Sequence, residues 1–155
     1  MKILMVCLGN ICRSPLAEGI LQNMAKKRAL NWEVESAGTN NYHIGSPPHK
    51  FSQKVAISRG IDICNQRARR FKPSDYQEFD YIIAMANDVV SDIKEIAGKS
   101  FQKEKTYLLM NFLHEGKNQD VPDPYYGEED GYHEVYDMIE AACEKLIEKI
   151  TDSEK

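Results

Sequence analysis

Short apolar runs alternate along the chain with longer amphipathic stretches. Four apolar runs have the length of buried strands, and they lie at 2–6, 32–37, 79–85 and 106–109. Four stretches carry apolar residues every three or four positions, as on one face of a helix, and they lie at 15–28, 49–59, 87–97 and about 128–150. This alternation predicts an α/β fold with three layers, in which helices cover both faces of a central four-stranded parallel sheet. A ligand would then bind beyond the carboxyl ends of the strands.

Residues with strong positional preferences mark the ends of these elements. Ser14 and Pro15 are expected as the N-cap and first residue of the first helix, and Gly60 is expected just after the second. A short helical turn is expected at 73–77. Residues 111–127 combine glycine and proline with little periodicity, so they predict a long loop, and such loops are often functional.

Length and composition narrow the class of protein. A chain of 155 residues, 42% of them hydrophobic and 28% charged, is expected to form one domain over residues 1–155. The formal net charge of −4 argues against a nucleic-acid binder. The first residues resemble neither a signal peptide nor a membrane span, and four cysteines in such a chain are expected to be reduced thiols. These features favour a cytoplasmic protein with no membrane association.

The stretch between the first strand and the first helix carries the candidate chemistry. Cys7 ends the strand, Gly9 and Asn10 follow, and Arg13 precedes the helix. The free backbone amides at a helix N-terminus bind anions, and an arginine can hold two oxygens of a phosphate at once. Both features also favour the thiolate form of a cysteine, which is the nucleophilic form. The stretch therefore predicts nucleophilic chemistry on a bound oxyanion.

The spacing of these residues resembles the phosphate-binding loop of protein tyrosine phosphatases. Residues 7–15 (CLGNICRSP) are similar to the low-molecular-weight branch of that family, and residues 123–127 (DPYYG) resemble its general-acid loop. Further similar segments lie at 36–39, 44–48, 68–69 and 80–83, so the resemblance covers nearly the whole chain.

The resemblance implies a catalytic role for three residues. Cys7 would attack phosphorus to form a phosphocysteine, Arg13 would bind the phosphate, and Asp123 would serve as general acid and then as general base. The phosphate-binding residues would be Leu8, Gly9, Asn10, Ile11, Cys12 and Arg13. No metal and no cofactor are expected.

Residues around the loop would support the nucleophile. Ser14 would donate its hydroxyl to the Cys7 thiolate. Asn10 would hold the loop in a left-handed conformation through bonds to neighbours such as Ser36. The family commonly has a histidine bracing this asparagine where this chain has Gln66, so Gln66 is expected to take over that contact.

The resemblance also places residues at the substrate. Leu8 and Ile11 would form apolar walls, while Tyr42, Tyr125 and Tyr126 would lie at the rim beside an aromatic ring. The expected partners are phosphotyrosine proteins, and the chain is expected to be a monomer or a weak homodimer. Related proteins that prefer phosphoarginine have threonine at the position of Ile11, so protein-arginine phosphatase activity is an alternative that the isoleucine disfavours.

The remaining cysteines bear on a second alternative, arsenate reductase. That activity needs additional cysteines that relay a disulfide, usually a nearby downstream pair. Cys64 and Cys143 are far apart in sequence and fall on apolar positions, so both are expected in the core. Cys12 is expected to form a reversible disulfide that protects Cys7 from over-oxidation.

Overall fold

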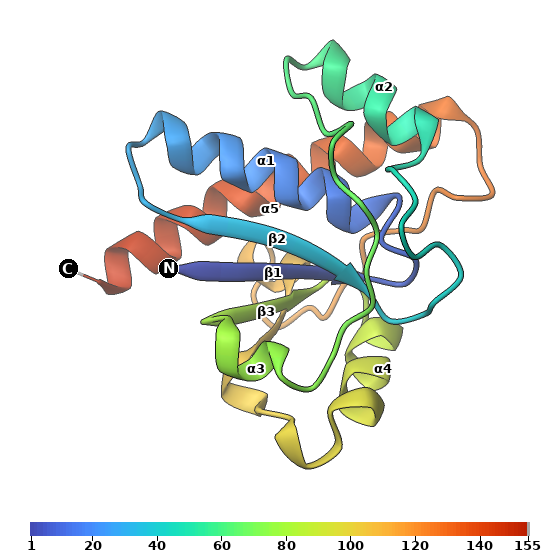
Figure 1. The fold of residues 1–155 in the computed structure, drawn as a ribbon. Helices are drawn as coiled ribbons and strands as arrows, with labels where there is room; N and C mark the ends of the chain where they lie inside the picture. The colour runs from blue at the N-terminus through green and yellow to red at the C-terminus, as the bar shows by residue number, and fades with distance from the viewer. Residues whose placement is uncertain (155) are drawn as a thin grey trace.

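In a computed structural model of the protein, which describes residues 1–154, four parallel strands form one sheet (Figure 1). The strands are β1 Lys2–Cys7, β2 Glu33–Gly38, β3 Tyr81–Ala84 and β4 Thr106–Leu108. Their order in space is β2-β1-β3-β4, so β1 lies between two neighbours and all four carboxyl ends meet at one edge. The predicted four-stranded parallel sheet is confirmed.

Helices cover both faces of this sheet. On one face lie α1 Arg13–Lys27, α2 Lys50–Ser58 and α5 Glu129–Ser153, and on the other lie α3 Asp75–Glu78 and α4 Asn87–Ala97 (Figure 1). Short 3-10 turns occupy Gly98–Ser100, Lys103–Lys105 and Leu109–Phe112. The three layers follow the predicted alternation, and the positive φ of 83° at Gly60, just after α2, agrees with its expected place.

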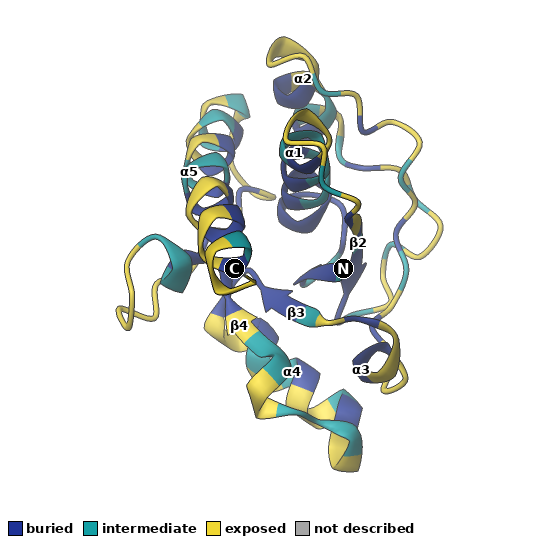
Figure 2. Ribbon diagram, turned by 90° about the vertical axis from the view of Figure 1, so that its left-hand side faces the viewer, coloured by how far each residue is buried: buried dark blue, intermediate teal, exposed yellow. Residues whose placement is uncertain are grey.

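Strand β1 is buried on both of its faces. Ile3, Met5 and Cys7 pack into the cluster under α1 and α5, whereas Leu4 and Val6 pack into the cluster under α3 and α4. Figure 2 shows the sheet buried between helices whose outer faces are exposed. Because side chains alternate along a strand, this register turns the Cys7 side chain toward α1.

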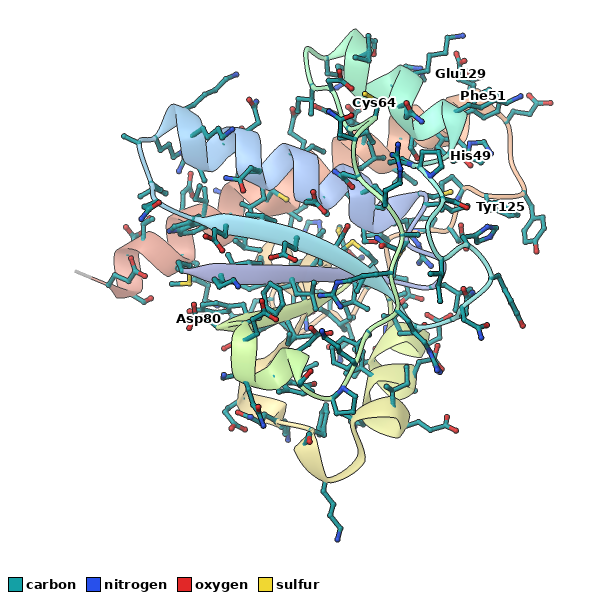
Figure 3. The ribbon with its side chains drawn as sticks, in the orientation of Figure 1. His49, Phe51, Cys64, Asp80, Tyr125 and Glu129 are labelled. Carbon is teal, nitrogen blue, oxygen red and sulfur yellow. The ribbon has the colours of Figure 1, made fainter. Side chains whose placement is uncertain are left out.

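The third strand is shorter than the predicted run of 79–85. Phe79 ends the short helix α3, and the backbone N–H of Lys2 donates to a carboxylate oxygen of Asp80 at 2.8 Å. Asp80 therefore lies where the sheet begins, at the end opposite Tyr125 (Figure 3). Phe79 and Met85 are both buried beyond the ends of the strand, which explains the longer apolar run, and the Met85 N–H donates to Val6 O at 2.9 Å.

The first helix begins two residues before the predicted start. Its first residue is Arg13 and its N-cap is Cys12, with no side chain capping it. The prediction of Ser14 as N-cap is wrong, because the Ser14 hydroxyl turns toward the end of β1 and lies 3.0 Å from Cys7 Sγ. Pro15 is accordingly the third helical residue. The first amides of α1 are left without a side-chain partner, as an anion-binding helix end requires.

None of the helices in residues 1–154 has the length and apolarity needed to cross a membrane.

Candidate active site

Asn10 holds the loop between β1 and α1 in a left-handed backbone conformation, with a φ of 57°. Its Nδ2 group donates to Ser14 Oγ at 2.8 Å and to Ser36 Oγ at 2.9 Å. Its Oδ1 atom accepts from the backbone N–H of Arg69 at 3.1 Å. The expected conformation and the expected bond to Ser36 are both present, and together the three bonds offset the strain of the positive φ.

Neighbouring segments bind the carbonyl groups of the loop. Leu8 O accepts from the Thr39 N–H at 2.9 Å, and Ile11 O accepts from the His49 N–H at 2.8 Å. In a trans peptide the N–H points opposite to the C=O, so the amides that follow these carbonyls point to the other side. The loop thus directs N–H groups toward its concave side, where an anion can accept from them.

Cys7 lies at the centre of this loop, and its residue is only 2% exposed. Its Sγ atom is 3.3 Å from the donating N–H nitrogen of Asn10 and 3.0 Å from Ser14 Oγ. Because Ser14 Oγ already accepts from Asn10, its own proton is free to be donated to the sulfur. These two donors favour a negatively charged sulfur.

Arg13 links the loop to a segment that lies more than one hundred residues further along the chain. Its guanidinium is buried and donates from one terminal nitrogen to Val121 O at 3.0 Å. The other terminal nitrogen lies 3.6 Å from a carboxylate oxygen of Asp123. The second Asp123 oxygen accepts from the Tyr125 N–H at 3.0 Å, which orients the carboxylate. The structure therefore brings Arg13 and Asp123 to one site, beside Cys7.

A cavity of about 120 Å³ opens over these groups. It is lined by Cys7, Leu8, Gly9, Ile11, Cys12, Arg13, Asn40, Tyr42, His43, Asp123, Tyr125 and Tyr126. All the residues expected at the substrate line it, and Asn10, Ser14 and Ser36 support its floor. Asn40 was not foreseen, since nothing in its sequence context marks it.

Aromatic side chains form the rim of the cavity. The ring centroid of Tyr125 lies 5.9 Å from that of His49 (Figure 3) and 5.9 Å from that of His43. Tyr42 is 81% exposed and Tyr126 is 95% exposed, so both project into solvent. Tyr125 is thus held by its neighbours, including Tyr126, whose ring lies 4.9 Å from it. Tyr42 and the outer face of Tyr126 remain exposed to a ligand.

Cys12 lies under the loop, with its Sγ atom 3.4 Å from the hydroxyl of Tyr132 in α5. Burial raises the pKa of the Cys12 thiol to about 12, despite the hydrogen bond from Tyr132. This thiol is therefore protonated at neutral pH, although it lines the same cavity as Cys7. Sequence periodicity placed Tyr132 in a helix but gave no signal for this contact.

Two expectations about residues near the site are wrong. Cys64 is exposed, because its N–H donates to Asp62 Oδ1 at 2.9 Å in a tight turn that sends Ile63 inward instead (Figure 3). Cys143 is buried, as predicted. Gln66 does not brace Asn10, since its Nε2 group donates to Pro15 O at 3.1 Å.

Comparisons with known proteins agree on one family and one fold. The model of the family described as low molecular weight phosphotyrosine protein phosphatase matches residues 2–155. The low molecular weight protein-tyrosine-phosphatase YfkJ of Bacillus subtilis is 38% identical over 153 residues, which cover 96% of this chain and 95% of that protein.

Solved structures extend the likeness to the fold. The crystal structure of YfkJ has a TM-score of 0.92 at 36% identity, covering 100% of this chain and 97% of that one. A protein tyrosine phosphatase from Entamoeba histolytica has a TM-score of 0.90 at 39% identity, with coverages of 100% and 99%. A Drosophila arginine phosphatase has a TM-score of 0.88 at 32% identity, with coverages of 97% and 98%.

Proposed function

This chain belongs to the low molecular weight phosphotyrosine protein phosphatase family, and we propose that it hydrolyses phosphotyrosine in proteins through a phosphocysteine on Cys7. As a member of that family it is a phosphoric monoester hydrolase. The observation that carries the proposed mechanism is that Cys7, Arg13 and Asp123 line one cavity.

In the first step the phosphate occupies the loop, where the amides and the Arg13 guanidinium share its charge. The Cys7 thiolate attacks phosphorus in line, and the bond from phosphorus to the tyrosine oxygen breaks. Asp123 gives its proton to that leaving oxygen. The buried guanidinium is already held by Val121 O, so it needs little reorganisation to stabilise the transition state.

In the second step water attacks the phosphocysteine. The Asp123 carboxylate takes a proton from this water, the phosphorus–sulfur bond breaks, and inorganic phosphate leaves. Cys7 returns to its thiolate form, and the Ser14 hydroxyl, 3.0 Å away, stabilises the charge that the sulfur regains.

The walls of the cavity favour an aryl phosphate over phosphoarginine. Leu8 and Ile11 present apolar side chains, and Tyr42 and Tyr125 lie where they can contact an aromatic ring. A guanidinium group would bury its polar N–H groups against Ile11 without a hydrogen-bond acceptor. We place the chain in the cytoplasm, acting on phosphotyrosine proteins as a monomer or a weak homodimer.

Arsenate reduction fits the cavity less well, because it needs further thiols beside Cys7. Cys12 lines the cavity, whereas neither the exposed Cys64 nor the buried Cys143 does. A relay of disulfides from the cavity to a reducing partner therefore has no third thiol at this site.

Replacing the nucleophile tests the proposed function. Cys7→Ser should lower kcat for p-nitrophenyl phosphate and for a phosphotyrosine peptide by at least about a thousandfold, because the nucleophile is lost. The exposed thiol variant Cys64→Ser is the matched control and should retain full activity. Substantial turnover by Cys7→Ser would contradict the mechanism, and faster turnover of a phosphoarginine peptide by the natural chain would contradict the substrate class.

A further inference from the structure

Glu18 on α1 lies behind the phosphate-binding loop and has no part in the chemistry described above. Its Oε1 atom accepts a hydrogen bond from Ser36 Oγ in β2 at 2.7 Å. Glu18 is partly buried and does not line the catalytic cavity. Its carboxylate is nevertheless connected to the nucleophile through a chain of hydrogen bonds whose directions can be worked out.

Asn10 sets these directions. The backbone N–H of Arg69 can only donate, so the Asn10 atom facing it is the amide oxygen. The amide NH₂ group therefore faces the other way, and it donates to both Ser14 Oγ and Ser36 Oγ. Each serine oxygen accepts from Asn10, and each must direct its own proton elsewhere.

Ser36 has one acceptor within reach, and Ser14 has two, of which the carbonyl oxygen of Ala37 is the more distant at 3.5 Å. The Ser36 proton goes to the Glu18 carboxylate at 2.7 Å, and the Ser14 proton goes to Cys7 Sγ at 3.0 Å. An ionised carboxylate can only accept, so it forces the Ser36 hydroxyl to point toward it. That orientation presents the Ser36 lone pairs to one N–H of the Asn10 amide. A well-anchored amide holds its second N–H on Ser14 Oγ, and the Ser14 proton then goes to the sulfur.

We propose that Glu18 is a positioning residue for the nucleophile, and that its carboxylate orients the hydrogen bonds that end on Cys7 Sγ. The proposal rests on the function proposed above, and it adds a residue that touches neither substrate nor the reacting atoms. The effect is largest when the carboxylate is ionised, because a charged acceptor makes the stronger and more directional hydrogen bond.

The surroundings of Glu18 let it change charge near neutral pH. Burial, with a smaller contribution from the nearby Glu35 carboxylate, raises the pKa of the Glu18 carboxyl to about 7, while the hydrogen bond from Ser36 and the charge of Arg69 oppose this rise. The carboxylate has no ion-pair partner of its own among residues 1–154, and the Arg69 guanidinium is held by a carboxylate in α3. Lys26 and Asp62 line the same recess at a rim open to solvent.

The recess that Glu18 lines also holds an unpartnered acceptor. Gln66 lines it, and its Oε1 atom is buried without a hydrogen-bond partner in the described part of the chain. An ionised carboxylate offers that oxygen no proton, whereas a carboxylic acid does. Protonation of Glu18 therefore weakens the hydrogen bond that Glu18 accepts from Ser36. The series of hydrogen bonds that ends on Cys7 Sγ is then less firmly oriented.

The test compares Glu18→Gln, which keeps an acceptor oxygen without the charge, and Glu18→Ala, which removes the acceptor. The matched control is Glu35→Gln, which removes a neighbouring charge that has no bond to Ser36. Two readouts are measured from about pH 5 to about pH 9, a range that extends to both sides of the pKa of Glu18. They are kcat for p-nitrophenyl phosphate and the rate at which iodoacetamide alkylates Cys7, followed by mass spectrometry of the peptide that contains it.

For both readouts, we expect the rate of the natural chain divided by the rate of Glu18→Gln to rise about fivefold as the pH passes neutrality. This is the size of one ordinary net hydrogen bond, because the carboxylate acts on the sulfur only through intervening groups. KM should change little. Glu35→Gln should keep the full rise but at a slightly lower pH, because it removes a charge that raises the pKa of Glu18. Glu18→Ala should be slower than Glu18→Gln at every pH.

Parallel pH profiles for the natural chain and Glu18→Gln would overturn the proposal, as would unchanged kcat and alkylation in Glu18→Ala. The alkylation rate keeps this test separate from the proposed function, because it needs no phosphatase activity. If the natural chain alkylates with the expected dependence but hydrolyses no aryl phosphate, the proposed function fails while the positioning role stands.

Discussion

The two carboxylate oxygens of Asp123 contact different groups, a backbone N–H and the Arg13 guanidinium. One carboxylate oxygen accepts from the Tyr125 N–H at 3.0 Å, and the other lies 3.6 Å from the Arg13 guanidinium. Its side chain is 37% exposed, so the carboxyl can reach both a leaving group and incoming water. This placement suits a carboxyl that first donates a proton and then accepts one.

Replacing Asp123 should separate good from poor leaving groups. Asp123→Ala should slow hydrolysis of phosphotyrosine by about 10²- to 10³-fold, because the phenolate oxygen leaves without a proton. The loss for p-nitrophenyl phosphate should be much smaller, since its leaving group needs little protonation. Hydrolysis rates for a series of aryl phosphates with different leaving groups measure this difference. Glu128→Gln, in the same segment, is the control. An equal loss of rate for all leaving groups would refute the acid role of Asp123.

Cys12 should act on the oxidised enzyme rather than in turnover. Peroxide converts Cys7 to a sulfenic acid. The Cys12 thiol then gives up its proton as it attacks that sulfur, a disulfide forms, and water is released. Cys12→Ser should therefore keep kcat within about threefold, because it alters no acid or nucleophile. It should recover less activity from dithiothreitol after peroxide treatment, and equal recovery in both proteins would remove the redox role.

At the scale of secondary structure, the end of β2 supports the phosphate-binding loop from behind. A Cβ atom on Gly38 would lie 2.8 Å from Leu8 O and 3.0 Å from Asn10 N. Real Cβ atoms do not approach backbone so closely, and the backbone cannot swing away as a side chain can. Gly38 is therefore required by the closeness of β2 to the loop.

Gly38→Ala should displace the loop. It should lower kcat by at least about tenfold and the free energy of unfolding by about 1–3 kcal/mol, which is typical of overpacking. Steady-state kinetics and urea unfolding measure both effects. Gly131→Ala in α5 meets only one atom, at 4.0 Å, so this control should keep activity and gain stability. Normal kinetics in Gly38→Ala would show that the loop does not depend on this close approach.

The elements and the motif residues could be predicted from sequence because each has a local signature. The periodicity of apolar residues that marks a strand or a helix depends only on residues near one another in sequence. Cys7 and Arg13 are also close in sequence, at the two ends of one loop. The contacts from Arg69, Val121 and Tyr132 could not be predicted, since they depend on how distant segments pack. Ser14 and Cys64 were misplaced for the same reason, because tertiary hydrogen bonds and a tight turn overrode the local pattern.

At the scale of the whole molecule, Glu18 should make stability depend on pH. Its pKa is raised to about 7 in the folded chain from an ordinary value of 4.5, so the folded state binds the proton more tightly than the unfolded state. The favourable contribution is therefore complete below about pH 4.5 and is lost as the pH rises through about 7. An ionised Glu18 destabilises the fold, although it is the form that positions the nucleophile.

Glu18→Gln should reveal this dependence, because glutamine has no proton to lose. Relative to the natural chain, its free energy of unfolding should be about 3 kcal/mol higher above pH 7, and this advantage should vanish below pH 4.5. Urea unfolding at several pH values measures the difference, with Glu35→Gln as control. A difference that does not vary with pH would contradict it.

The bonds that shape the phosphate-binding loop join residues that lie 26, 59, 108 and 120 positions apart in the chain. Long loops must close before any of these contacts can form, so such contacts appear late in folding, after local helices. A half-folded molecule, rich in helix but lacking these closures, has a loop without its bonds to Ser36 and Arg69, and an arginine without its anchor at Val121 or the acid beside it. Catalytic activity therefore requires the complete fold, and a partly folded chain would not hydrolyse phosphorylated proteins.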